Sequence, residues 1–337
     1  MKEKVVIGIS MGDPAGCGPE LIVKALRKAS YNLAKYVIIG SYKVILKAQE
    51  IVGDKSLKLI RIQDLSELPE ESNAIGVYDI DNVDLGSLVY GRPSVVGGRA
   101  SYEYIVKAVE FAKAGLVNAI VTMPISKESL NMAGYRYPGH TELLADLTKA
   151  KEVRMMLIAK HLRVTHVTTH IPLKNVPDLI KKDRVLKTIE LTHEYLRDYF
   201  RLEEPKIAVA GLNPHAGESG LFGDEEAEEI VPAIYEARGR GIDAQGPFPP
   251  DTVFYRAYNN KEFDAVIAMY HDQGHIAVKM VGFMEGVNVT LGLPIIRVSP
   301  DHGTAWDKAG KGSADETATY EAIMLAVYLA MNKDRKR

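Results

Sequence analysis

Cysteine is nearly absent from this chain: Cys17 is the single one among 337 residues. One cysteine can form neither an intrachain disulfide nor a CxxC metal or redox motif. This usage fits a reducing cytoplasm, where disulfides are rare. No apolar run reaches the roughly 18 residues of a membrane span, and the first apolar stretch is too short for a signal peptide. The sequence therefore predicts a cytoplasmic protein that does not interact with membranes.

An excess of charge of one sign is also lacking, since 42 basic residues face 44 acidic residues and the formal net charge is −2. A nucleic-acid-binding domain usually carries a basic stripe, so no nucleic-acid partner is predicted. Hydrophobic residues make up 46% and charged residues 26%, as in ordinary globular proteins. The length corresponds to one large domain or two ordinary ones.

Short β-branched runs alternate with longer helical patterns along the chain. Several runs are apolar without a break, as strands covered on both faces must be. This alternation predicts an α/β fold with a largely parallel sheet. The predicted strands are Val5–Ser10, Tyr36–Gly40, Ala119–Met123, Met155–Ala159, Val164–Thr169, Ile207–Ala210, Ala265–Tyr270, Val287–Leu291 and Ile295–Val298. Predicted helices include Tyr102–Ala112, Asp183–Phe200, Asp224–Arg238 and Asp315–Met331.

A glycine-rich segment, MGDPAGCGPE at 11–20, follows the first predicted strand. Such a turn can bring backbone N–H groups near an anion at a helix start. Its spacing matches neither the dinucleotide fingerprint nor the P-loop, and neither motif occurs elsewhere. A tight turn is the simpler interpretation, and Pro19 suits the first turn of a helix.

Five of the nine histidines sit beside Gly or Pro at predicted strand ends, where open α/β sheets bind ligands. Imidazole is the commonest metal ligand, and three such histidines would form an open metal site. For any one of them alone, a surface or satisfied core position is the alternative. The five are His140, His170, His215, His271 and His302, whereas His161, His166, His193 and His275 are interpreted as structural.

Four further polar residues have two interpretations each. Lys279 and Arg297 can recognise phosphate or carboxylate oxygens, or can form surface salt bridges. Asn288 interrupts an apolar strand, so its amide needs a partner, either in the protein or in a ligand. Asp251, in GPFPPDT, can cap a turn or orient a ligand or base near a metal.

Longer motifs extend in order over nearly the whole chain. They are MGDPAGCGPE (11–20), YPGHTELLA (137–145), TTHIPL (168–173), GLNPHAGESGLFGDEE (211–226), GPFPPDTVF (246–254), AMYHDQGHIAVK (268–279) and GVNVTLGLPIIRVSPDHGTAWDKAGKG (286–312). With these motifs the sequence resembles the 4-hydroxythreonine-4-phosphate dehydrogenases of pyridoxal phosphate biosynthesis. The string HDQGHI is more similar to a sister group that oxidises 4-phospho-D-threonate or 4-phospho-D-erythronate.

The resemblance implies an isocitrate/isopropylmalate dehydrogenase-like fold, with two α/β/α domains and a cleft between them. The first domain would comprise residues 1–140 and 285–337, and the second residues 141–284. The resemblance also implies a homodimer with a shared active site, in which His170 and His215 come from one subunit and His271 from the other.

The family's site residues transfer to matching positions of this sequence. The implied metal ligands are His170, His215 and His271, for zinc, magnesium, manganese or cobalt. The implied substrate-binding residues are His140, Thr141, Lys279, Asn288 and Arg297. The segment 302–312 resembles a cofactor-adenosine loop, with His302, Gly303, Thr304 and Asp307 as cofactor-binding residues. Lys279 and Asp251 are the candidates for proton transfer.

The implied reaction is the metal-dependent oxidation of a 4-phosphorylated hydroxy acid by NAD, or alternatively NADP, followed by decarboxylation of the 3-keto acid. A divalent metal lowers the pKa of the alcohol, and the nicotinamide accepts the hydride. No covalent nucleophile is needed, so Cys17 is interpreted as structural. Two alternatives stay open: a dihydrodiol dehydrogenase of an aromatic acid, and a non-catalytic protein that binds phosphorylated metabolites.

Overall fold

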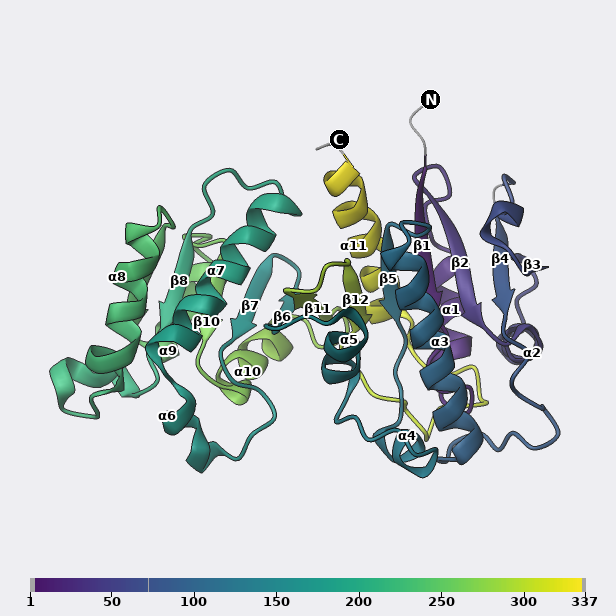
Figure 1. The fold of residues 1–337 in the computed structure, drawn as a ribbon, viewed down its shortest axis with the longest axis horizontal. Helices are drawn as coiled ribbons and strands as arrows, with labels where there is room; N and C mark the ends of the chain where they lie inside the picture. The colour runs from purple at the N-terminus through teal and green to yellow at the C-terminus, as the bar shows by residue number, and fades with distance from the viewer. Residues whose placement is uncertain (1–3, 72, 335–337) are drawn as a thin grey trace. The chain divides into compact units, whose positions relative to one another are not determined.

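A computed structural model describes residues 4–71 and 73–334 of the chain (Figure 1). The chain forms two compact units, the first running up to Val153 and resuming at Leu293, the second spanning Arg154–Gly292. Both boundaries lie further along the chain than the sequence predicted. Helix α5 (His140–Thr148) belongs to the first unit because it packs against helix α3 of that unit. Strand β11 (Val287–Leu291) belongs to the second unit because it pairs with β6.

The first unit is built on a parallel sheet with the strand order β3-β4-β2-β1-β5-β12. Parallel neighbours need crossover connections, and helices supply them here. Helices α3 and α11 pack on the central strands β1 and β5, and α1 packs against α2 and α11. The strands are β1 (Val5–Ser10), β2 (Ala34–Gly40), β3 (Lys58–Ile62), β4 (Ala74–Asp79), β5 (Ala119–Thr122) and β12 (Arg297–Pro300). The helices are α1 (Gly18–Leu26), α2 (Tyr42–Val52), α3 (Val95–Lys113), α4 (Lys127–Met132), α5 and α11 (Thr317–Asp334).

The second unit has the strand order β11-β6-β7-β10-β8-β9. Strands β7, β10, β8 and β9 are parallel, whereas β11 and β7 both run antiparallel to β6. Helix α10 packs on β6 and β7, and α9 packs on β8 and β10. The strands are β6 (Arg154–Ala159), β7 (Leu162–His166), β8 (Ile207–Ala210), β9 (Ala244–Phe248), β10 (Ala265–Ala268) and β11. The helices are α6 (Val176–Leu179), α7 (Lys182–Asp198), α8 (Val231–Gly239), α9 (Pro250–Tyr258) and α10 (His271–Val281).

The predicted α/β class is confirmed, and β1, β8 and β11 have the predicted bounds. Strands β3, β4 and β9 were not predicted. β3 is a partly exposed edge strand with Lys58 and Arg61, and β9 contains a Gly-Pro pair, so neither shows an unbroken apolar run. The predicted strand Ile295–Val298 is displaced in the structure, where β12 begins at Arg297 and ends at Pro300.

Each unit has its own hydrophobic core between sheet and helices. In the first unit, Val37 and Ile120 of the sheet meet Ile105 of α3 and Leu143 of α5. In the second unit the core includes Val164, Val266 and Val278. Within the described residues, no helix combines the length and apolarity that a bilayer crossing requires.

Candidate functional site

Two of the predicted metal ligands, His170 and His271, lie side by side in the second unit. They follow β7 and β10, which are parallel neighbours, so both loops leave the sheet at its carboxyl edge. Pairing continues past the strands, since Val167 and Thr168 donate to the carbonyls of Ala268 and Met269. The two imidazole centroids are 5.5 Å apart, and both rings line a cavity of about 400 Å³. The pairing of β7 with β10 therefore places two imidazoles in the lining of one pocket.

The ring of His271 is held by its own helix. Nδ1 of His271 lies 2.6 Å from Oδ1 of Asp272, and the ring stacks on His275 with centroids 3.5 Å apart. A carboxylate at one ring nitrogen orients the ring and leaves the other nitrogen for a ligand. His275 was interpreted as structural and Asp272 was not singled out. The signal for His275 was available, because residues four apart on a helix share a face.

His166 lies behind this cluster and is a core histidine, as the sequence indicated. It is 1% exposed, and its ring lies 4.7 Å from that of His275. Burial, followed by the charge of His275, lowers the pKa of His166 to about 3. The imidazole is therefore neutral at physiological pH.

His215 lies on a tightly wound loop after β8. All six residues from 215 to 220 have positive φ, and four of them are not glycine: His215 at 54°, Ala216 at 55°, Glu218 at 43° and Ser219 at 59°. Left-handed conformations of this kind are costly and persist where neighbouring structure enforces them. The result is an exposed imidazole on a strained turn.

Glu226, which sequence reasoning missed, holds the base of that loop. Its carboxylate is buried, and Oε1 accepts hydrogen bonds from the backbone N–H groups of Leu212 and Asn213, both at 2.7 Å. A Cβ at Gly217 would lie 2.7 Å from Oε2 of Glu226, so only glycine fits there. The sequence did contain a signal for Glu226, because this glutamate stands at the end of the glycine-rich motif 211–226.

Gln273 connects this loop to the start of α10. Its Oε1 accepts from Met269 N–H at 2.7 Å, and its Nε2 donates to the carbonyl of Gly211 at 2.9 Å. Even so, across the described part of this single chain, no three His, Cys, Asp or Glu side chains are placed to hold one metal ion. The predicted three-ligand set is thus only partly brought together, as the pair His170 and His271.

Three other predicted residues lie in the second unit. Lys279 follows His271 by two turns of α10, and its Nζ lies 5.2 Å from the centroid of the Phe283 ring. Oδ1 of Asn288, on β11, is buried and has no hydrogen-bond partner among the described residues. Asp251 is exposed in the first turn of α9, where an acidic residue favours the helix dipole.

Arg297, His140 and Thr141 lie in the first unit. Arg297 is 2% exposed, and its Nε and Nη2 donate to Oγ1 of Thr122 at 3.0 and 2.7 Å. Burial lowers the pKa of Arg297 to about 9, so the guanidinium keeps its charge at neutral pH. Burial, and then the charge of Arg297, holds the pKa of His140 well below its usual range.

His140 does not lie at a strand end, so that prediction is wrong: it opens helix α5, after α4 has intervened. Its Nε2 is buried without a hydrogen-bond partner among the described residues. The neutral imidazole, the buried guanidinium and a helix N-terminus together favour an anionic group.

The segment 302–312 follows β12 in the first unit and packs on the turn 11–20. Cys17 N–H donates to the carbonyl of Thr304 at 3.1 Å, and Nδ1 of His302 lies 2.9 Å from the carbonyl of Gly303. The turn uses other N–H groups internally as well, with Asp13 donating to Pro124 and Gly16 to Asp13. The tight-turn interpretation of 11–20 is confirmed.

We expect Cys17 to be inert in the folded protein. The thiol is 0% exposed, and burial, with the nearby charge of Glu20, raises its pKa to about 12. A thiol reacts as the thiolate, so the native protein at pH 8 should not react with a chromogenic disulfide reagent. After unfolding in guanidinium one thiol per chain should react. Stoichiometric labelling of the native protein would contradict this.

Comparison with known proteins assigns the family. The family model described as "Pyridoxal phosphate biosynthetic protein PdxA" matches residues 32–326. The putative D-threonate 4-phosphate dehydrogenase of Oceanobacillus iheyensis is 47% identical over 99% of this chain and 100% of its own. The 4-hydroxythreonine-4-phosphate dehydrogenase of Desulforapulum autotrophicum is 45% identical over 96% and 95%.

A solved structure agrees with these sequence matches. The crystal structure of a 4-hydroxythreonine-4-phosphate dehydrogenase from Burkholderia phymatum superposes with a TM-score of 0.85 at 47% identity, covering 97% of this chain and 99% of the other. The similarity extends over both units and over the segments that carry the site residues. The family resemblance read from the sequence is confirmed, and the chain belongs to the PdxA family of pyridoxal phosphate biosynthetic proteins.

Proposed function

We propose that this dehydrogenase of the PdxA family oxidises a 4-phosphorylated hydroxy acid with NAD and a divalent metal. The substrate is 4-phosphohydroxy-L-threonine, or 4-phospho-D-threonate or D-erythronate, and NADP is the alternative cofactor. The observation that carries the proposal is that the carboxyl ends of the parallel strands β7 and β10 present two imidazoles, His170 and His271, with rings 5.5 Å apart. Each can serve a metal site that a second subunit completes. When bound, the metal acts as a Lewis acid on substrate oxygens and the nicotinamide accepts the hydride.

His170, His215 and His271 are the proposed ligands of the metal, which is zinc, magnesium, manganese or cobalt. Asp272 supports this role for His271, because it occupies Nδ1 and leaves Nε2 available. Glu226 and Gln273 keep the loop of His215 tied to β8 and to the start of α10. These contacts orient ligands before any metal binds.

Arg297, His140 and Thr141 are the proposed binding residues for the anionic end of the substrate. A buried guanidinium held by a threonine hydroxyl is a fixed cation whose planar fork matches phosphate or carboxylate oxygens. The neutral His140 donates or accepts one hydrogen bond without adding charge. Asn288 and Lys279, in the second unit, are assigned to the other polar groups, and the buried Oδ1 of Asn288 would accept from a hydroxyl.

Lys279 Nζ and the Asp251 carboxylate are the proposed proton carriers. Lys279 shares helix α10 with His271, which supports a position near the alcohol. Asp251 lies in the first turn of α9 and is exposed, so its carboxylate is accessible as a proton acceptor. The cofactor-binding residues we propose are His302, Gly303, Thr304 and Asp307, in the segment that packs on the turn 11–20.

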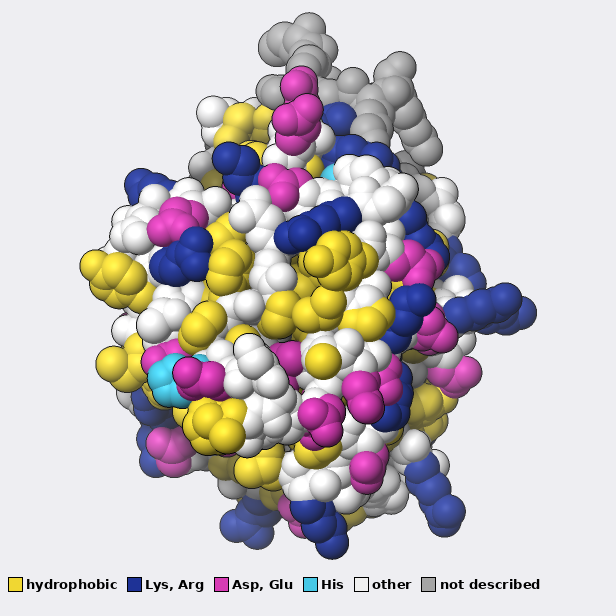
Figure 2. Space-filling view, turned by 90° about the vertical axis from the view of Figure 1, so that its left-hand side faces the viewer, with side chains coloured by type: hydrophobic (Ala, Val, Ile, Leu, Met, Phe, Trp, Pro, Cys, Tyr) yellow, Lys and Arg dark blue, Asp and Glu magenta, His cyan; other side chains and the backbone are white. Residues whose placement is uncertain are grey.

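The working form is proposed to be a cytoplasmic homodimer with a shared site. Figure 2 shows one face of the molecule, with hydrophobic side chains near its middle and charged ones around them. On α10 and just beyond it, Ile276 is 63%, Met280 83% and Phe283 69% exposed. Exposed apolar rows of this kind mark protein interfaces. A second copy of this chain seated there would meet the helix that begins at His271.

Reduction of NAD with a panel of 4-phosphorylated hydroxy acids tests the proposed function. We expect turnover that is abolished by a chelator and restored by adding back one of the four metals. The metal's removal should leave the circular dichroism unchanged, which separates loss of activity from unfolding. Full turnover in a verified metal-free preparation would contradict the metal assignment.

Two outcomes of the same panel would favour the alternatives. Preference for an unphosphorylated cis-dihydrodiol over every phosphorylated acid would favour the dihydrodiol dehydrogenase. Binding of phosphorylated acids without turnover under any condition would favour a non-catalytic binding protein.

A further inference from the structure

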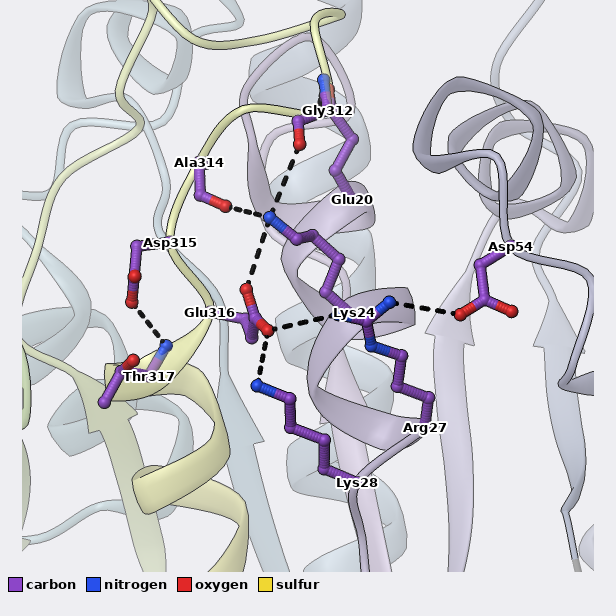
Figure 3. Close-up of polar contacts among 10 residues, drawn as sticks. All are labelled: Glu20, Lys24, Arg27, Lys28, Asp54, Gly312, Ala314, Asp315, Glu316 and Thr317. Atoms are coloured by element: carbon purple, nitrogen blue, oxygen red, sulfur yellow. Dashed lines mark hydrogen bonds and ion pairs between the residues drawn. The ribbon is translucent and has the colours of Figure 1, made fainter.

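Glu20 is a buried carboxylate on helix α1 that faces the backbone of the segment 302–312. It is 1% exposed. Oε1 accepts a hydrogen bond from Gly310 N–H at 2.5 Å, and Oε2 accepts one from Gly312 N–H at 2.6 Å. Figure 3 shows the side chain of Glu20 reaching Gly312. Because both oxygens of a charged group accept from the same short stretch, this is a strong two-point attachment.

Both glycines that bind Glu20 have a left-handed backbone conformation. Gly310 and Gly312 have φ values of 77° and 66°, a region that glycine enters freely and other residues avoid. A Cβ at Gly310 would lie 3.1 Å from the Tyr90 ring, and one at Gly312 would lie 3.0 Å from the carbonyl of Ile51. The conformation therefore favours glycine, and the Glu20 carboxylate accepts hydrogen bonds from both of these residues.

Further contacts fix the two ends of the segment to the same helix. At its start, Thr304 accepts from Cys17 N–H. Beyond its end, Lys24 donates to the carbonyls of Gly312 and Ala314 and forms an ion pair with Glu316 at 3.2 Å (Figure 3). Glu20 thus holds the stretch that lies between two other attachments.

We propose that Glu20 is a positioning residue for the dinucleotide: it sets the backbone of the segment 302–312 for binding the adenosine half of NAD. The role rests on the cofactor assignment proposed above. Glu20 acts through Gly310 and Gly312 and is assigned no contact with the cofactor. The motif 11–20 thereby gains a role that its sequence spacing did not indicate. Its turn and first helical residues contact the segment 302–312 and support its backbone.

The single tryptophan of the chain, Trp306, lies within this segment and reports on it directly. Glu20→Gln keeps the size of the side chain but replaces one accepting oxygen with an NH₂ group that cannot accept, and Glu20→Ala removes both acceptors. In both variants we expect acrylamide to quench Trp306 more strongly without nucleotide. The KM for NAD should rise about tenfold, the factor that corresponds to about 1.4 kcal/mol. The KM for the phosphorylated acid should stay unchanged.

The control is Glu50→Gln, which removes an exposed carboxylate paired with Lys47 on α2 and should change neither readout. A purely structural role for Glu20 would lower kcat through loss of folded enzyme and leave the KM for NAD unchanged. Wild-type quenching in both folded Glu20 variants would overturn the proposal. A wild-type protein that fails to bind NAD, while the Glu20 variants still show increased quenching, would instead overturn the cofactor assignment and with it the dinucleotide role.

Discussion

His215→Ala and His271→Ala, each inactive as a pure protein, should regain activity when their subunits are exchanged with each other. In a shared site with twofold symmetry, one site of the mixed dimer carries both lesions and the other carries neither. About half of the sites in each mixed dimer should then work. The expectation follows from the family resemblance, and the exposed apolar row that continues from His271 along α10 supports it.

Mixtures with His170→Ala assign the third ligand. The family resemblance places His170 with His215, so His170→Ala should be rescued by His271→Ala and not by His215→Ala. The opposite pattern would mean that one subunit supplies both His170 and His271 to the same site, in keeping with their ring separation of 5.5 Å within the chain. His161→Ala is the control, because His161 stacks on Tyr258 and belongs to no proposed site. No recovery in any mixture, with subunit exchange shown by native mass spectrometry, would reject the shared site.

Arg297→Ala should lower kcat/KM for a phosphorylated acid by about 10- to 150-fold, the loss expected when a charged hydrogen-bond partner of 1.5–3 kcal/mol is removed. Arg297→Lys should recover only part of this, because lysine retains the charge and loses the planar fork. The guanidinium is buried on Thr122, so the cation is pre-oriented and gives up little water when an anion binds. Steady-state kinetics with varied acid and saturating NAD measure the effect.

Arg154 offers a matched control for Arg297. It is also a buried arginine, 8% exposed, and its Nε donates to Oγ1 of Thr188 at 2.8 Å. Arg154→Lys should lower the thermal unfolding midpoint and leave the KM of the acid unchanged. If Arg297→Ala altered only stability, as Arg154→Lys should, its assignment to the substrate would be wrong.

Most strands with both faces buried were predicted from the sequence, although β4 was missed. Runs such as Ile207–Ala210 are apolar throughout because helices cover both sides, and such runs are visible without any tertiary information. β3, with the burial of an edge strand, has no such signature. Arg297 shows the same limit of sequence patterns. Its polarity alone does not indicate that the side chain is buried against the hydroxyl of Thr122.

The sequence by itself determined the α/β class, the family and four of the five histidines assigned to strand-end loops, because these depend on local periodicity and on long motifs. His140 was the exception, since it begins helix α5. Only the tertiary structure decided which of those side chains meet. β7 and β10 are about a hundred residues apart in the chain, yet their pairing sets His170 beside His271. The supporting contacts of Gln273, Glu226 and Glu20 also depend on tertiary structure, since each joins a carboxylate or amide to groups that sequence spacing does not bring together. Buried polar groups form hydrogen bonds with whatever partners lie beside them in the folded protein, and a sequence pattern does not give those three-dimensional positions.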